Sequence, residues 1–218
     1  MFESLTTSGK DEITLLKVKR TDERYQSIRD RHYVANKGTH GQQMHYLIYL
    51  ADDIVGIISG ASSVFAVKAR DEFFGLNKEN KRVALPSIIN NTVFRLEVHV
   101  PNLATKALSL WRKRIAADWQ QRYGVQVHGF ETFVVENDTR KGTLYKADNW
   151  TYLGDTVGST KTHPKGMNQK SERVRTSVKM IYALKIKGTK LSTEYTPTWN
   201  LTKAKHDRNR SEERRVGK

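Results

Sequence analysis

The sequence predicts a single mixed α/β domain in which a mostly antiparallel central sheet is flanked by helices. Three observations predict it. The 218 residues, of which 37% are hydrophobic, are enough to bury one good core. Two β-rich runs, 44–50 and 54–59, are joined by a short polar turn, which is typical of an antiparallel hairpin. A long amphipathic stretch at 102–123 lies between two strand-like runs, which places a helix between strands.

The remaining elements follow from local patterns, because alternation of apolar residues predicts strands and a 3.6-residue spacing predicts helices. We expect strands at residues 12–19, 92–100, 125–135, 150–157 and 178–186, with the strand at 92–100 in the centre of the sheet. We expect helices at residues 22–33 and 139–147, and a loop or short helical region at 61–85. Glycines at 38–41 break the chain before the hairpin.

The stretch 102–123 is helical in pattern along its whole length. Its apolar stripe consists of Ala104, Leu108, Trp111, Ile115 and Trp119. Asn102 stands where an N-cap residue is expected, and Gly124 stands where a left-handed residue would end the helix. Pro101 should end the preceding strand, because proline cannot donate to a strand ladder.

The formal net charge of +15 is unevenly distributed along the chain. Residues 161–218 hold 16 Lys and Arg against 5 Asp and Glu, a net +11, which leaves +4 for the rest. Such a segment favours polyanions through counterion release, and nucleic acid is the commonest partner of this kind, with a solvated tail as the alternative. We expect the domain to span 1–200 with a basic loop at about 158–177. Residues 201–218 read as a disordered tail resembling a vector- or assembly-derived scar.

Composition also excludes several classes of protein. The chain has no cysteine, so disulfides, thiolate metal sites and a cysteine nucleophile are excluded. The longest apolar runs, such as 54–58, fall far short of the roughly 20 residues of a membrane span. We therefore expect a soluble, cytoplasmic protein. The histidines lack a ligand spacing, so no metal site is expected.

The junction between the strand at 92–100 and the following helix is a candidate donor site. The first turn of a helix offers unpaired N–H groups and the positive end of the helix dipole, which together favour anions. The residues expected to hold a nucleotide-like donor are Val100, Asn102, Leu103, Ala104 and Thr105. The alternative is an ordinary capped core helix.

A second candidate cluster combines Glu131 with Tyr145, Asn149 and Trp150. A phenol, an amide and an indole near the point where a helix returns into a strand can hold a planar base by stacking and hydrogen bonding. Equally, Trp150 can be a core residue of the sheet.

A third candidate is the pair His32 and Tyr33, which ends a helix before a glycine-rich loop. Histidine can act as a general base near neutral pH, although a lone histidine is more often a polar residue at a helix end.

Charged and amide side chains beside apolar runs are further candidates for substrate binding, namely Arg70, Asp71, Asn91 and Arg95. Arg95 and Glu97 lie on one face of the expected strand, because alternate residues share a face. They pair with each other in one interpretation. In the other, Arg95 orients a phosphate in a cleft and Glu97 takes a proton.

Several ordered motifs together resemble a known family. They include Asn-Asn-Thr-Val-Phe-Arg at 90–95, Val-Pro-Asn-Leu-Ala at 100–104, Glu-Thr-Phe-Val at 131–134 and Gly-Thr-Leu-Tyr-Lys-Ala-Asp-Asn-Trp at 142–150. Over about residues 29–158 the sequence resembles the DruA-like family of bacterial defence systems. The histidine-tyrosine pair at 32–33 and the pattern at 142–150 are also similar to the Mom-like DNA-modification proteins.

The Mom-like resemblance implies a GNAT-like fold and the transfer of an acyl- or aminoacyl-derived group to an exocyclic base amine, with adenine N6 as the target. The donor it implies is an acyl-CoA or an aminoacyl-tRNA. By position, Tyr145, His32 and Tyr33 match residues of the Mom-like pattern, and Glu131 and Glu136 are candidates for its acid. The partner it implies is double-stranded DNA, and the residues expected on the DNA backbone are Lys170, Arg173 and Arg175.

Two other functions compete with this one. The glycine-rich pyrophosphate loop that is usual in GNAT proteins is missing before Leu103. A non-catalytic nucleic-acid-binding subunit of a defence system is therefore one alternative. A conventional GNAT acetyltransferase is the other, and tight acetyl-CoA binding without affinity for DNA would favour it.

Overall fold

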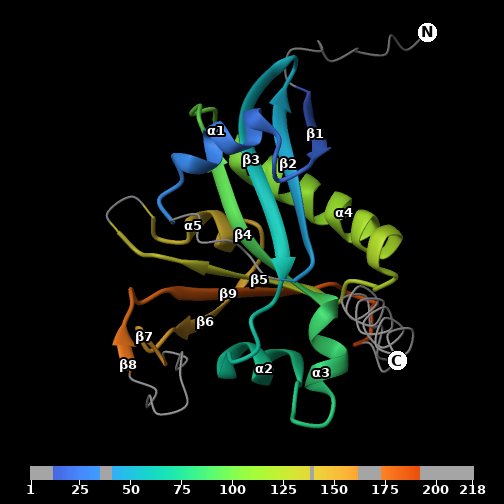
Figure 1. Ribbon diagram of the computed structural model, residues 1–218, viewed down its shortest axis with the longest axis vertical. Coiled ribbons are helices and arrows are strands. Elements are labelled where there is room, and N and C mark those ends of the chain that lie inside the picture. Colours follow the sequence, from blue (N-terminus) through green and yellow to red (C-terminus); the bar gives the residue numbers. More distant parts are fainter. Residues whose placement is uncertain (1–11, 35–40, 138–139, 162–172, 192–218) are drawn as a thin grey trace, which may run out of the picture.

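The computed structural model describes residues 12–34, 41–137, 140–161 and 173–191, and a seven-stranded sheet in the order β1-β2-β3-β4-β5-β9-β6 runs through them (Figure 1). The strands of this sheet are β1 (Ile13–Val18), β2 (Gln43–Leu50), β3 (Asp53–Ser62), β4 (Ile88–Leu96), β5 (Gly129–Val134), β6 (Thr151–Asp155) and β9 (Met180–Lys185). A separate hairpin pairs β7 (Ser159–Lys161) with β8 (Arg173–Arg175). Among the described strands only β4 and β5 pair in parallel, so the predicted mixed, mostly antiparallel sheet is confirmed.

Helices cover both faces of the sheet (Figure 1). They are α1 (Glu23–Asp30), α2 (Lys68–Phe74), α3 (Lys81–Ala84), the 3₁₀ turn η2 (Leu85–Ser87), α4 (Leu103–Tyr123) and α5 (Thr143–Ala147). The hydrophobic clusters place α4 and α5 on one face, and α1, α2 and α3 on the other. Each expected helix is present, although α1 and α5 are shorter than predicted.

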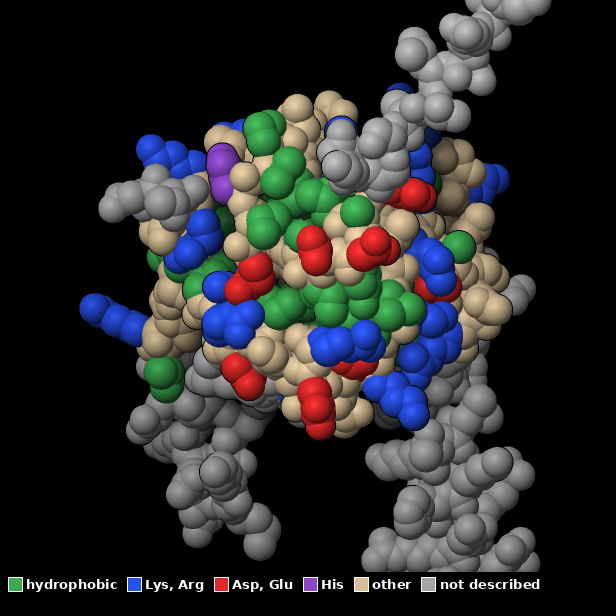
Figure 2. All heavy atoms as spheres, turned by 90° about the horizontal axis from the view of Figure 1, so that it is seen from above, with side chains coloured by type: hydrophobic (Ala, Val, Ile, Leu, Met, Phe, Trp, Pro, Cys, Tyr) green, Lys and Arg blue, Asp and Glu red, His purple; other side chains and the backbone are tan. Residues whose placement is uncertain are grey.

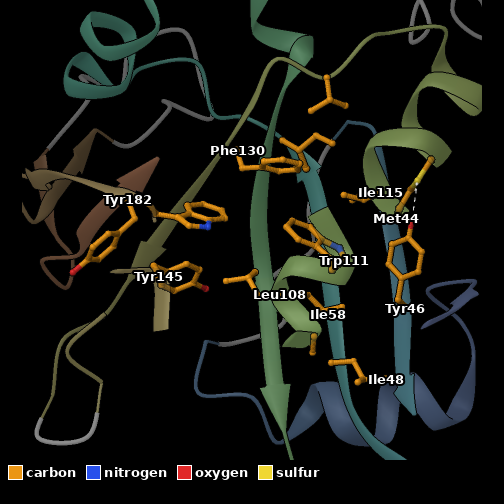
Figure 3. Close-up of a cluster of buried hydrophobic side chains, with 14 of the residues drawn as sticks. Met44, Tyr46, Ile48, Ile58, Leu108, Trp111, Ile115, Phe130, Tyr145 and Tyr182 are labelled. Carbon is orange, nitrogen blue, oxygen red and sulfur yellow. Dashed lines mark hydrogen bonds between the residues drawn. The ribbon is translucent and has the colours of Figure 1, made fainter. Parts of the chain in front are cut away.

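The main core lies between α4 and the sheet (Figure 3). Trp111 and Ile115 are fully buried and pack over β3 at Gly60. A Cβ atom on Gly60 would lie 2.4 Å from Ile115 Cδ1 and 3.0 Å from Trp111 Cζ2, so only glycine lets the helix approach this closely. The predicted stripe is confirmed at Leu108, Trp111, Ile115 and Trp119, whereas Ala104 is only partly buried.

The opposite face has two smaller clusters. Tyr25 and Ile28 of α1 pack on Leu47, Ile57 and Val93 of the sheet. The second cluster joins α2 and α3 to the far part of the sheet and contains Phe74, Leu76, Ala84, Leu85, Ile88 and Ala183. The sheet is therefore buried on both sides, and its central strands carry no solvent face.

Strand β4 contains one extra residue. Ser59 of β3 pairs with Val93 and Gly60 pairs with Asn91, so Thr92 between them has no partner in β3. This β-bulge reverses the alternation of side chains. Asn91 consequently shares the α4 face with Ile89, whereas Val93 packs toward α1.

The strand predicted at 92–100 is wrong in its boundaries. It begins four residues earlier, at the buried Ile88, and ends at Leu96. Val98 and Val100 were expected to continue its apolar face, but their exposed fractions are 42% and 41%. The bulge at Thr92 accounts for the late predicted start, because it interrupts the simple alternation between Ile88 and Val93.

Some predictions fall outside the described residues. The glycine break at 38–41 is described only at Gly41, which has φ 83°. The centre of the expected basic loop, residues 162–172, and the whole tail at 201–218 are not among the described residues.

Gly60→Ala should lower the free energy of unfolding by about 1–3 kcal/mol, because its methyl group overpacks the contact between α4 and β3. Urea unfolding should show a lower midpoint at an unchanged slope. Thr14→Ala, at an exposed position of β1, is the control and should leave the midpoint where it is. An unchanged midpoint for Gly60→Ala would mean that α4 shifts freely over the sheet.

Candidate active site

The parallel strands β4 and β5 part after a short ladder. Their four paired positions run from Ile88 with Gly129 to Asn91 with Thr132. Beyond this point β4 continues to Leu96, and in the described part of the chain no strand pairs with that side of it. A strand edge without a partner presents backbone N–H and C=O groups to a ligand. The parting of the strands, visible in Figure 1, is therefore the first feature of the site.

Tyr145 of α5 reaches the point where the strands part. Its hydroxyl group donates to Asn91 Oδ1 at 2.9 Å. Thr132 Oγ1 lies 3.4 Å from the phenol oxygen and donates to the carbonyl of Asn91 at 3.1 Å. Asn91 Nδ2 donates to the carbonyls of Ser59 and Val93 at 3.0 and 3.2 Å, which aims Oδ1 at Tyr145. The bulge in β4 and the phenol are thus joined through one amide.

The surroundings of Tyr145 keep its phenol neutral. The ring stacks on Tyr182 at 5.7 Å between centroids and meets Trp150 edge-on at 5.1 Å. Burial raises the pKa of Tyr145 well above that of an ordinary phenol, so the hydroxyl stays protonated at neutral pH. Gly142, at φ 69° before α5, is required because a Cβ atom there would lie 2.2 Å from Tyr182 Oη.

A pocket of about 190 Å³ opens beside Tyr145, and we call it the Tyr145 pocket. Tyr33, Phe94 and Arg140 also line it. The ring of Tyr33 is 43% exposed, and the guanidinium of Arg140 lies 4.0 Å from its centroid. The structure therefore brings together Tyr33 and Tyr145, which lie far apart in the sequence. Their catalytic roles stay predictions.

His32 lies directly behind Tyr33. The two rings are 4.5 Å apart, and His32 Nδ1 accepts the backbone N–H of Val34 at 3.2 Å. Burial lowers the pKa of His32 to about 4, and the charge of Arg29 adds to the effect. The imidazole is therefore neutral at pH 7, with Nδ1 as its acceptor.

Glu131, predicted as an acid or base, lies on the other face of the sheet. Thr132 faces Tyr145, so its neighbour Glu131 points toward α2, where Arg70 Nη1 donates to Glu131 Oε2 at 2.7 Å. Both side chains are fully buried, and burial raises the pKa of Glu131. Arg70 also contacts Asp71 and the carbonyl of Val64 at 2.7 Å. These placements do not fit catalysis by Glu131 or DNA binding by Arg70 and Asp71; they fit a buried structural pair.

The structure supports the simpler interpretation of Arg95, in which it pairs with Glu97. Its Nε pairs with Glu97, and its Nη1 donates to the carbonyl of Arg31 at 2.5 Å. Glu97 also accepts from Arg31 Nη2 at 2.8 Å. These contacts tie the end of β4 to the end of α1, directly behind His32.

Trp150 and Asn149 differ from the expected base-binding pair. Trp150 is 4% exposed and packs in the core, where its Nε1 donates to Asp148 Oδ2 at 2.8 Å. It has no free face for a base. Asn149 is exposed in a left-handed conformation with φ 63°. The core interpretation of Trp150 is the one that the structure supports.

The first turn of α4 lacks the expected cap. Asn102 has φ 62°, in the left-handed region, and its side chain makes no capping hydrogen bond. Asn102 thus holds the predicted N-cap position, but its backbone is not extended and its side chain does not cap the turn. Leu103 is buried and its N–H donates to the carbonyl of Val100 at 3.2 Å, while Ala104 and Thr105 are partly exposed. Donor binding here stays a prediction.

The basic residues expected on DNA are only partly described. Lys170 lies outside the described residues, Arg173 belongs to β8, and Arg175 of the same strand is exposed. Figure 2 shows that the upper face of the molecule mixes Lys and Arg with Asp and Glu around a band of hydrophobic side chains. The described part of that face is therefore not uniformly basic.

Two positioning residues were missed in the sequence. Arg112 of α4 donates twice to Asp148, with both distances 2.7 Å, and so fixes the end of α5 beside α4. An aspartate directly after a short helix and an arginine on the flank of a long one carry no local signal of pairing. Only the fold brings them together.

The described residues contain neither a metal-binding cluster nor a membrane-spanning helix. No three His, Asp or Glu side chains gather closely enough there to hold a metal ion. Among the described helices, none is both long and apolar enough to cross a lipid bilayer.

Comparisons with known proteins agree with this architecture. A family described as "Druantia protein DruA" matches residues 4–182. NAA60 of Arabidopsis thaliana in complex with acetyl-CoA aligns over 80% of this chain and 100% of its own, with a TM-score of 0.50 and 11% identity. A Bacillus subtilis acetyltransferase in complex with CoA covers 80% and 99%, with a TM-score of 0.48 and 7% identity. The search of curated proteins found no match. At such identities the likeness establishes an acetyltransferase-like fold alone.

Arg70→Ala should lower the free energy of unfolding by about 3–5 kcal/mol, because it leaves Glu131 buried without its partner. Replacing both residues, Arg70→Met with Glu131→Leu, should restore most of that loss. Chemical denaturation checks both. Lys68→Ala, on an exposed side chain of the same helix, is the matched control. If Arg70→Ala were as stable as this control, the pair would not be structural.

Stability should fall with pH below about 6.5. The pKa of His32 is lowered to about 4 in the folded protein, so between its ordinary value and 4 the unfolded chain binds a proton that the folded chain does not. Urea midpoints measured across this window should decrease with decreasing pH. His32→Gln should make the decrease shallower, and an identical slope in the variant would contradict the assignment.

Proposed function

This chain belongs to the DruA family, and on that premise we propose that it is an acyltransferase acting on DNA. It would transfer a small acyl- or aminoacyl-derived group from an activated donor to an exocyclic base amine, with adenine N6 as the preferred target. One observation carries the proposal. A buried, protonated Tyr145 stands where β4 and β5 part and lines a pocket open to ligands.

An acyl-CoA is the favoured donor. The shared fold includes NAA60, which is described in complex with acetyl-CoA. The unpaired edge of β4 suits an extended amide-containing chain, because such a chain can complete the strand's hydrogen bonds. The first turn of α4, over Leu103, Ala104 and Thr105, would hold the pyrophosphate, with Val100 and Asn102 shaping the entry. Since Asn102 does not cap this turn, the N–H groups of Ala104 and Thr105 stay available to an anion, whereas that of Leu103 donates to the carbonyl of Val100. An aminoacyl-tRNA is the alternative donor.

The reaction needs one proton transfer. The amine nitrogen attacks the carbonyl carbon, the C–N bond forms, and the C–S bond to CoA breaks. The amine loses a proton and the departing thiolate gains one, so the overall reaction is balanced. Tyr145 would donate a hydrogen bond to the sulfur as negative charge develops there. This requires its hydroxyl to turn from Asn91 Oδ1 toward the donor.

His32 is the remaining candidate for accepting the proton, and in that role its Nδ1, the ring nitrogen with the lone pair, would have to release the N–H of Val34. It is neutral at pH 7 and lies against Tyr33, which lines the Tyr145 pocket. Glu131 is no longer proposed, because it points to the opposite face.

The target base would lie beside Tyr33 and would have to displace the guanidinium of Arg140, which covers one face of the ring at 4.0 Å. This ring is half-exposed beside Tyr145, whereas Trp150 has no free face. Arg140 and Lys141 at the same pocket would attract a polyanion, and the net charge of +15 supports the choice of DNA. Arg173, Arg175 and Lys170 would contact its backbone. Entry of the base requires flipping or access through the major groove.

A second candidate function is a conventional acetyltransferase that modifies a protein amine. The fold shared with NAA60 favours it. A non-catalytic DNA-binding subunit is the third, and the absent glycine-rich loop favours that one. The three candidate functions differ in what an experiment would detect: transfer to DNA, transfer to protein, or DNA binding without transfer.

Tyr145→Phe should abolish the modified nucleoside that the unchanged protein produces in cellular DNA. Mass spectrometry of total nucleosides measures it, and the mass difference identifies the transferred group. The variant also leaves Asn91 Oδ1 unpaired, which should cost about 1–3 kcal/mol of stability.

Tyr46→Phe is the matched control, because it removes another buried phenol hydrogen bond, to Asp118 at 2.9 Å, outside the Tyr145 pocket. It should keep the modification. Acetylation of protein but not DNA would favour the second candidate, and soluble protein that binds DNA without any transfer would favour the third.

A further inference from the structure

A second pocket, of about 380 Å³, lies where β1 ends and β2 begins, beside the last turn of α4. We call it the His45 pocket. Four of its lining residues are cationic: Lys17, Lys19, Arg20 and Arg122. None of the described lining residues is acidic, and none also lines the Tyr145 pocket. A concave surface lined by one sign of charge concentrates counter-ions of the other sign.

His45 lines this pocket with a ring whose orientation is held from behind. Its Nδ1 lies 3.0 Å from Ser59 Oγ and 3.1 Å from Tyr25 Oη, and the two hydroxyl groups are 2.8 Å apart. If Nδ1 accepts, both hydroxyl protons are used within this triangle. That arrangement places the ring proton on Nε2, as a donor.

His45 Nε2 is buried and has no hydrogen-bond partner among the described residues. The whole side chain is only 7% exposed. Burial lowers the pKa of His45 to about 4, and repulsion from Arg20, Arg122 and Arg29 adds to this effect. A buried donor without an acceptor is costly, and an anion in the pocket would supply the acceptor.

The cations of the pocket are incompletely neutralised. Lys17 lies 3.4 Å from Asp118, but that carboxylate also accepts from Arg114 at 3.1 Å and from Tyr46. Lys19 and Arg122 are exposed, with no ion pair to a described acid. The local excess of positive charge therefore remains available to an anion.

We propose that the His45 pocket binds a backbone phosphate of duplex DNA, with Lys19 and Arg122 as its charged contacts and His45 as a buried donor. The choice of DNA rests on the proposed function. Arg112 holds α5, and Arg122 lies ten residues further along α4, about 15 Å along the helix axis. A small acceptor could not occupy both places, whereas a duplex can.

The test measures binding of the full-length protein to a short fluorescein-labelled DNA duplex by anisotropy at several salt concentrations. Each phosphate contact contributes about 0.9 to the slope of log K against log salt. Lys19→Gln with Arg122→Gln removes the contacts to this one phosphate and should therefore reduce the slope by roughly 1 and weaken binding at low salt. Lys106→Gln with Lys113→Gln, two exposed positions of α4 outside the pocket, is the matched control and should keep the slope.

A second readout follows the His45 ring by NMR. A bound phosphate favours the imidazolium, so DNA should raise the pKa of His45 in the unchanged protein but much less in the Lys19 and Arg122 double variant. An unaltered slope in the double variant overturns the proposal, as does a His45 pKa raised by inorganic phosphate but not by DNA.

The two proposals fail separately. If the slope falls by roughly 1 but no modified nucleoside forms, the phosphate pocket stands and the transferase function fails. If the modified nucleoside forms but the slope is unchanged in the double variant, the transferase function stands and the phosphate pocket fails.

Discussion

The single hydrogen bond between Tyr145 and Asn91 depends on the bulge at Thr92, and much of the candidate site depends on both. Without the extra residue, Asn91 and Val93 would point to the same face of β4. The amide would then lie under α1, or the valine would lie beside α5. Because the bulge sends them to opposite faces, β4 can fill the core below α1 and still present a polar group to the phenol. Bulges are common beside active sites for this reason.

The two faces of β5 have different roles: one holds a buried ion pair and the other borders the candidate site. Glu131 and Thr132 are neighbours, yet one belongs to a buried ion pair with Arg70 and the other to the environment of Tyr145. The face with Arg70 fastens α2 to the sheet, and the face with Thr132 borders the pocket. A rigid pair on one side of β5 thus limits how far the strand can move on the other.

Periodicity along the chain predicted most elements because helices and hairpins are local. The apolar stripe of α4 could be predicted from residue spacing alone, and the hairpin of β2 and β3 from two β-rich runs joined by a turn. The candidate site was harder to predict from the sequence. Asn91-Thr92-Val93 reads as plain alternation, and only pairing with β3 reveals the bulge. The role of Glu131 depends on which face of a doubly covered sheet it occupies, which alternation alone does not determine.

Helix α4 also sets a length scale. It is one unbroken rod of 21 residues, anchored near its middle to α5 through Arg112 and carrying Arg122 in its last turn. At about 3.4 Å per base pair, the 15 Å or so between those residues corresponds to about four base pairs of B-form duplex. If the His45 pocket binds DNA as proposed, it would hold the duplex to one side of the modified base. Its footprint would be asymmetric, and flanking bases would matter more on that side than on the other.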